Sequence, residues 1–209
     1  MSAPADPPTL RGLLVDYGGV LTTDVFVSFA EFCRTEGIDP DTVRRRFRAD
    51  PGSRELLAEL ECGRIAEADF EQRFAEQLGV EAPGLIERLF RGARAEEAMF
   101  TAVRAARAAG VRTGLISNSW GNRGYDRGLL PELFDGVVIS GDVGIRKPDP
   151  RMYELGAEAI GLKPDACAYV DDLPGNLKPA RVLGMTTIHH RSAHETIAEL
   201  EGLLDVPLR

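Results

Sequence analysis

The sequence from Leu13 to Thr22 reads Leu-Leu-Val-Asp-Tyr-Gly-Gly-Val-Leu-Thr. Three apolar residues lead directly to Asp16, and two glycines follow shortly after it. An apolar run that stops at a breaker is typical of a short buried strand. Asp16 is therefore expected at the carboxyl end of a strand, where open α/β sheets bind ligands. Because Asp also opens turns, this stretch alone leaves a structural and a functional aspartate equally open.

Composition limits the classes of partner. The chain has 209 residues, the size of one α/β domain or of a domain with an insertion. Its formal net charge of -8 argues against nucleic acid or an anionic membrane as a partner, because phosphate backbones require clustered Lys and Arg. The basic cluster Arg44–Arg46 with Arg48 is interpreted as a solvated helix face. No apolar run approaches the roughly 18 residues of a membrane span.

The N-terminus and the cysteines indicate a compartment. Residues 1–8 are rich in Pro and Ala and lack the basic start and apolar centre of a secretion signal, so we expect a disordered tail. Cys33, Cys62 and Cys167 form no CxxC pair. Free thiols of this kind are typical of a reducing compartment, and the predicted location is cytoplasmic.

The segment from Asp24 to about Arg94 is helical in character. Apolar residues recur there at three- and four-residue spacing, as at Phe26, Phe29 and Cys33, and no strand pattern is present. We interpret residues 23–94 as a helical insertion with its own small core. Its aromatic stripes are better explained as core than as a cofactor site.

Strand and helix patterns alternate in the rest of the chain. Strands are expected at 13–15, 111–117, 135–140, 166–171 and 185–190, and helices at 98–109, 151–160, 177–183 and 193–203. This alternation predicts a parallel sheet with right-handed crossovers. The predicted class is therefore α/β, with a core formed by residues 9–22 and 95–209.

Polar residues follow four of the expected strands. They are Asp16, Ser117, Lys147 and the pair Asp171–Asp172. Each has a structural explanation, since Ser117 could cap a helix, Lys147 could lie on the surface and the acidic pair could form a turn. Together at one edge of a parallel sheet they suit a phosphate and a hard cation, because carboxylates hold Mg²⁺ and a lysine neutralises phosphate.

The four positions, taken in order, resemble the four motifs of the haloacid dehalogenase superfamily of aspartyl-nucleophile hydrolases. The resemblance implies a Rossmann-like sheet and makes the insertion at 23–94 similar to the superfamily's α-helical cap, most clearly at Gly63-Arg64-Ile65 and Phe70. From Ser117 to His189 the chain resembles the phosphatase domain of bifunctional epoxide hydrolases. The quoted matches are residues 117–120, 143–148, 171–172 and 176–181.

The resemblance implies a covalent mechanism on a small phosphorylated substrate. Asp16 is the expected nucleophile that forms an aspartyl phosphate. Ser117, Asn118 and Lys147 are expected to bind the phosphoryl oxygens. The expected cofactor is Mg²⁺. Its site would comprise the Asp16 carboxylate, the main-chain carbonyl of Gly18, Asp172 and the adjacent Asp171.

Gly18 departs from the family pattern. Most phosphatases of this family have there a second aspartate that protonates the leaving oxygen, and general acid–base catalysis is worth typically about 10²–10⁴-fold. The expected enzyme is therefore slow or uses another acid, for which Asp24, Thr22 and Thr23 are the nearby candidates.

Two other functions remain open for this sequence. Gly18 is compatible with a non-catalytic protein that binds a phosphorylated ligand. A metal-independent 2-haloacid dehalogenase also lacks the second aspartate and has a tyrosine after the Lys-Pro-Asp stretch, here Tyr153. The acidic pair Asp171–Asp172 argues against dehalogenation, because those enzymes do not keep it.

Overall fold

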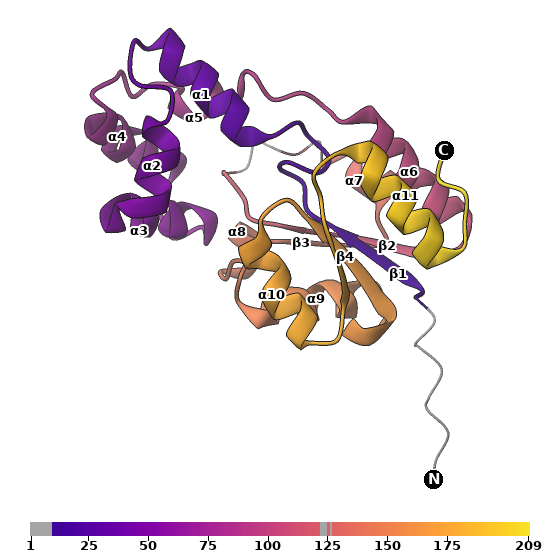
Figure 1. The fold of residues 1–209 in the computed structure, drawn as a ribbon. Coiled ribbons are helices and arrows are strands. Elements are labelled where there is room, and N and C mark those ends of the chain that lie inside the picture. The colour runs from indigo at the N-terminus through magenta and orange to yellow at the C-terminus, as the bar shows by residue number, and fades with distance from the viewer. Residues whose placement is uncertain (1–9, 122–124, 126) are drawn as a thin grey trace.

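The protein forms one sheet of five parallel strands, seen in a computed structural model that describes residues 10–121, 125 and 127–209 (Figure 1). The strands are β1 Gly12–Val15, β2 Arg112–Ser117, β3 Gly136–Ile139, β4 Cys167–Asp171 and β5 Thr186–His189. Their order in the sheet is β3-β2-β1-β4-β5, and every pair is parallel. The predicted α/β class is confirmed. The tail expected at residues 1–8 lies outside the described residues.

Strand β1 occupies the middle of the sheet because both of its faces are apolar. Successive side chains of a strand point to opposite faces. Leu13 and Val15 accordingly enter one buried cluster, and Leu14 enters another. Both clusters lie under helices, so the continuous apolar run reflects burial on two sides.

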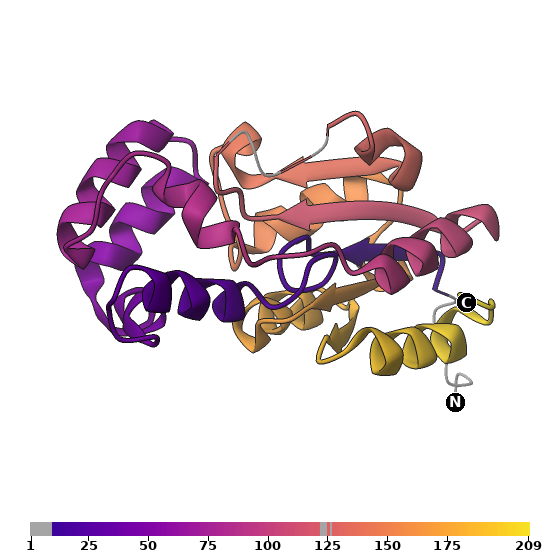
Figure 2. The ribbon, with the colours of Figure 1, turned by 90° about the horizontal axis from the view of Figure 1, so that it is seen from above.

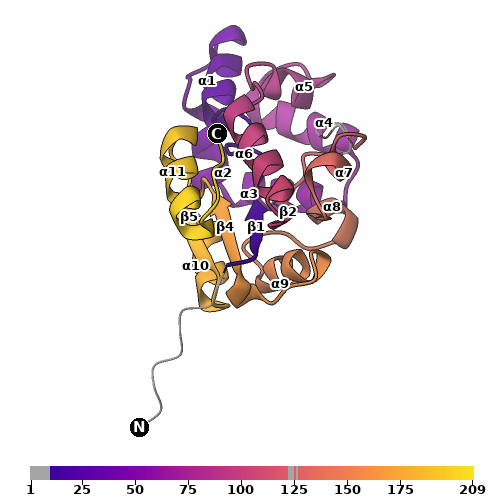
Figure 3. The same ribbon diagram turned by 90° about the vertical axis from the view of Figure 1, so that its right-hand side faces the viewer.

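Two pairs of helices cover the two faces of the sheet (Figure 3). Helices α6 Glu97–Ala108 and α11 Ala193–Leu204 pack on the face of Leu13, and α9 Pro150–Ala159 and α10 Pro174–Val182 pack on the face of Leu14. The shorter elements are α7 Leu130–Leu133, α8 Ser140–Val143 and the 3-10 helix η1 Pro164–Ala166. No helix within the described ranges is both long and apolar enough to cross a membrane.

Residues 25–90 form what we call the helical unit. It comprises α1 Val25–Thr35, α2 Thr42–Ala49, α3 Pro51–Glu61, α4 Glu67–Leu78 and α5 Leu85–Phe90. All residues of this segment are described, and they include no strand. The unit has its own apolar core, in which Phe47 stacks on Phe74 with ring centroids 4.7 Å apart. Figure 2 places it beyond the end of the sheet at which β1 terminates.

Two adjacent segments connect the helical unit to the sheet. Thr22 forms an antiparallel bridge with Ala95, and the Thr23 amide donates to the Arg94 carbonyl at 2.8 Å. The chain therefore leaves and re-enters the core at one place, directly after Asp16 and its glycine turn.

Candidate active site

Asp16 lies at the carboxyl end of β1, as expected. Its amide donates to the Val170 carbonyl of β4 at 2.9 Å, which fixes the backbone at that edge. One carboxylate oxygen accepts from the Tyr17 amide at 2.7 Å, and the other lies 2.7 Å from Lys147 Nζ. Asp16 is 7% exposed and its side chain 11%, so the carboxylate is largely removed from water without being fully enclosed.

Lys147 is buried between two carboxylates. Its Nζ also lies 2.8 Å from Asp171 Oδ2, and the side chain is 1% exposed. Burial alone would lower the pKa of Lys147, but the charges of Asp16 and Asp171 hold it above its usual value. The site therefore contains a permanent, desolvated ammonium group beside Asp16.

Asp171 is held by many donors. Besides Lys147 it accepts from the Tyr169 hydroxyl, from the Leu173 amide at 2.8 Å and from Asn176 Nδ2 at 3.0 Å. Burial raises the pKa of Asp171, but Lys147 and these hydrogen bonds bring it below its usual value. Asp171 thus stays ionised and fixes the position of Lys147.

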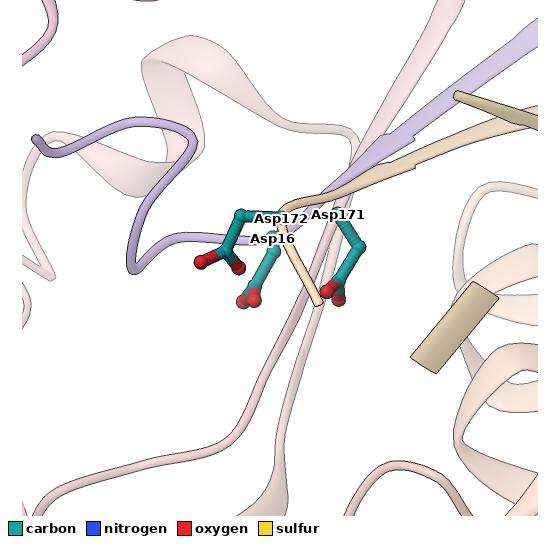
Figure 4. Close-up of side chains that lie close together, drawn as sticks. All are labelled: Asp16, Asp171 and Asp172. Carbon is teal, nitrogen blue, oxygen red and sulfur yellow. The ribbon is translucent and has the colours of Figure 1, made fainter. Parts of the chain in front are cut away.

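The side chains of Asp16, Asp171 and Asp172 lie close together (Figure 4). Each offers a carboxylate oxygen within 4.8 Å of the others. Burial, with added repulsion from neighbouring carboxylates, raises the pKa of Asp16 to about 8 and that of Asp172 to about 7. A divalent cation would relieve this repulsion, and hard cations prefer oxygen ligands. The donor set therefore fits Mg²⁺.

The two glycines after Tyr17 differ in what they require. Gly19 has φ +74°, and a Cβ there would lie 2.5 Å from Asp172 Oδ2, so the turn passes directly against that carboxylate. Gly18 lies outside the left-handed region, and a Cβ there would meet Val25 Cγ1 at 3.5 Å, an ordinary contact. The backbone therefore accepts a side chain at position 18.

The three candidates for a substitute acid each make structural hydrogen bonds. Asp24 caps α1 by accepting from the Phe26 amide at 2.8 Å. Thr22 Oγ1 accepts from the Gly19 amide at 3.0 Å, and Thr23 Oγ1 accepts from the Arg94 amide at 3.1 Å. These bonds hold the turn and the connection to the helical unit.

Ser117 is the last residue of β2, and Asn118 follows it at the same edge. Since Leu115 pairs with Val15, Ser117 lies beside the residues that follow β1. Asn118 Oδ1 accepts from the Lys147 amide at 2.8 Å, and its Nδ2 donates to the Lys147 carbonyl at 3.1 Å. In this structure Asn118 thus holds the main chain of Lys147.

Three residues around the site were missed by sequence reasoning. Tyr125 Oη lies 2.8 Å from Ser117 Oγ, Tyr169 donates to Asp171, and Glu61 of the helical unit contacts Asn118 at 3.4 Å. Tyr169 could have been found, because it precedes Asp171 by two residues and so shares its face of β4. Tyr125 and Glu61 follow no strand and gave no signal.

Sequence comparisons relate the chain to known hydrolases. The family model described as haloacid dehalogenase-like hydrolase matches residues 10–184. The bifunctional epoxide hydrolase 2 of Rattus norvegicus is 33% identical over 110 residues, 49% of this chain and 20% of that protein. A phosphatase of Mycobacterium tuberculosis is 33% identical over 88 residues, 40% of this chain and 41% of that protein. The matched segments therefore span less than half of either relative.

A solved structure shows the same fold. The crystal structure of a HAD family enzyme from Bacteroides thetaiotaomicron, in complex with magnesium and inorganic phosphate, superposes with a TM-score of 0.66 at 21% identity. The superposition covers 86% of this chain and 93% of that one. The resemblance found in the sequence is confirmed.

Proposed function

The chain belongs to the haloacid dehalogenase-like hydrolase family, and we propose that it is a Mg²⁺-dependent phosphatase acting on a small phosphate ester through an aspartyl phosphate at Asp16. One observation supports the proposal most. A buried ammonium, Lys147, touches Asp16 at 2.7 Å, beside an acidic pair whose oxygens converge with that of Asp16. A phosphoryl group and a cation together match these charges.

The proposed reaction assigns a step to each side chain. An Asp16 oxygen forms a bond to phosphorus while the bond from phosphorus to the ester oxygen breaks. Lys147 and the Ser117 hydroxyl bind the oxygens of the transferred group, where charge accumulates. Water then attacks the same phosphorus, which releases phosphate and regenerates Asp16.

Mg²⁺ fits the site as its cofactor. Asp16, the Gly18 carbonyl and Asp172 would hold it, with Asp171 beside them. When bound, it supplies positive charge that stabilises the transferring phosphoryl group. Because position 18 has no carboxyl group, the departing alkoxide lacks the family's usual proton donor. The proposed activity therefore favours esters whose leaving group departs without protonation.

We propose that residues 23–94, which contain the helical unit, are the family's cap. Two observations support this assignment. The unit lies beyond the carboxyl end of β1, and it joins the core beside the glycine turn. The proposed location is cytoplasmic, since Cys33, Cys62 and Cys167 are free thiols.

A phosphate-release screen tests this function. Aryl, acyl and alkyl phosphates are assayed with Mg²⁺ or with a chelator, using wild type, Asp16→Asn and Asp172→Ala. Asp142→Asn is the matched control, because that carboxylate lies on the surface in a pair with Arg127. We expect phosphate release only with Mg²⁺. Asp16→Asn and Asp172→Ala should lose the activity, and Asp142→Asn should keep it.

Binding measurements identify the alternatives. If calorimetry detects phosphate ester binding but no ester is hydrolysed, the chain is a binding protein. If Asp172→Ala binds Mg²⁺ as wild type does, the cation site is assigned wrongly. Release of halide from a 2-haloacid without Mg²⁺ would replace the phosphatase by a dehalogenase.

A further inference from the structure

Glu61 is the last residue of α3 and the point at which the helical unit reaches the site. Its side chain is only 6% exposed, and its Oε2 lies 2.6 Å from Arg146 Nε. The same oxygen accepts from Asn118 Nδ2 at 3.4 Å. A carboxylate of the helical unit is thus buried against two residues of the core, Arg146 and Asn118.

Both partners of Glu61 also hold the main chain of Lys147. The Lys147 carbonyl accepts from Asn118 Nδ2 at 3.1 Å and from Arg146 Nε at 3.2 Å. The Lys147 amide donates to Asn118 Oδ1 at 2.8 Å. Asn118 Nδ2 and Arg146 Nε therefore lie between Glu61 and Lys147. Each contacts both the Glu61 carboxylate and the Lys147 carbonyl.

The main chain of Glu61 also contacts the core. Its carbonyl accepts from the Ser140 hydroxyl and, at 3.4 Å, from Ser119 Oγ. Two residues later, a Cβ on Gly63 would lie 2.8 Å from the Gly141 carbonyl, so the end of α3 approaches α8 as closely as a glycine allows. Glu61 therefore contacts Arg146 and Asn118 from a fixed backbone.

A second contact fastens the same part of the core to the helical unit. Trp120 follows Ser117 by three residues, and its ring packs among those of four phenylalanines of the unit. Centroid distances are 5.4 Å to Phe29, 5.6 Å to Phe47, 5.8 Å to Phe70 and 5.1 Å to Phe90. The segment that carries Ser117 and Asn118 is thus held at both its polar and its aromatic residues.

We propose that Glu61 is a positioning residue, through which docking of the helical unit sets the place of Lys147 beside Asp16. The inference rests on the proposed function, because it assigns Lys147 to the phosphoryl group. Glu61 touches no reacting atom in this account. It orients Arg146 and Asn118, which fix the lysine peptide, and the lysine side chain then extends to Asp16.

The test compares Glu61→Gln with Glu36→Gln. Glu36 is a matched control, since it pairs with Arg88 Nε at 3.0 Å within the helical unit and is itself 20% exposed. Glu61→Gln keeps the shape but removes the charge that holds Arg146. We expect kcat to fall roughly 10- to 100-fold, as for a displaced catalytic group, with KM changed far less. Glu36→Gln should leave both unchanged.

Hydrogen exchange gives a readout that needs no activity. The Lys147 amide, which donates to Asn118, should exchange at least about tenfold faster in Glu61→Gln, whereas amides of α6 keep the wild-type rate. Arg146→Met removes the partner of Glu61 on the core side, and it should likewise speed the exchange of the Lys147 amide. An unchanged Lys147 exchange rate in both variants overturns the inference. Faster exchange in a protein that hydrolyses no phosphate ester overturns the proposed function alone.

Discussion

The end of the sheet and the helical unit are both buried, but they bury different chemistry. At the sheet edge, the Lys147 ammonium and the carboxylates of Asp16 and Asp171 lie almost wholly out of water. In the helical unit the buried groups are mainly apolar side chains, among them the rings of Phe70 and Phe74, which are 0% exposed. Burial stabilises apolar surface and penalises charge. The sheet edge therefore keeps charged groups in a place where burial raises the pKa of Asp16, whereas the core of the helical unit contains apolar side chains.

Removing Lys147 should have the largest effect. Lys147→Met leaves Asp16 and Asp171 buried without their shared partner, which destabilises proteins by about 3–5 kcal/mol. Activity should fall below detection. Urea unfolding in the presence of a chelator measures the loss of stability. Glu36→Gln breaks a pair in the helical unit whose two side chains are each 20% exposed, and it should cost less than about 1 kcal/mol. Equal losses of unfolding free energy in Lys147→Met and Glu36→Gln would contradict the proposed difference between the two regions.

An aromatic deletion in the helical unit should be nearly as destabilising but should leave the cation site intact. Phe74 packs on Phe47 at 4.7 Å and on Phe70 at 5.4 Å, so Phe74→Ala should lose about 3–5 kcal/mol. The exposed Val27 serves as control, with a change within about 0.5 kcal/mol for Val27→Ala. The increase in melting temperature on adding Mg²⁺ should match wild type in both. Its loss in Phe74→Ala would mean that the ring cluster supports the cation site.

Restoring a carboxyl group at position 18 should raise the rate by about 10²-fold on alkyl phosphates, the low end of general acid–base catalysis. Aryl phosphates should gain less, because their leaving groups need no proton. Gly18→Asp is compatible with the backbone and meets only Val25. Gly202→Asp, which adds a carboxyl group in open space on α11, is the control. If the wild-type rate does not depend on the leaving-group pKa, another group already supplies the proton.

The smallest expected effect is a pH dependence of stability without Mg²⁺. Since burial raises the pKa of Asp16 to about 8, the folded protein holds a proton there that the unfolded chain has lost above about pH 4. The free energy of unfolding should therefore fall as pH rises from about 4 to about 8. Burial also raises the pKa values of Asp172 and Glu61 to about 7. Only the part between about pH 7 and 8 is therefore assigned to Asp16, where one proton contributes at most about 1.4 kcal/mol per pH unit. His190 titrates below this window, because burial lowers its pKa. A slope that persists in Asp16→Asn would assign the effect to other groups.

The sequence predicted the sheet, and it pointed to side chains that the structure brings together, because both depend on local patterns. Apolar runs that end in polar residues pointed to Asp16, Ser117 and the acidic pair, and Lys147 was found in the polar stretch that follows the third expected strand. Glu61 could not be predicted in the same way, since its role depends on where α3 docks against Ser140 and Arg146. The hydrogen bonds of Asn118 to Lys147 likewise depend on tertiary structure. Trp120 belongs to a motif found in the sequence, but its packing among the rings of the helical unit depends on the tertiary structure.

The central claim is that phosphoryl transfer passes through Asp16. It is tested most directly by acid-quenching the enzyme during turnover of an aryl phosphate and measuring the mass of the peptide that contains Asp16. With Mg²⁺, the wild-type peptide should carry one phosphoryl group, and the peptide from Asp16→Asn or from a chelator-treated sample should carry none. Steady phosphate release by wild type with no phosphoryl group on that peptide, or release by Asp16→Asn at the wild-type rate, would contradict the claim.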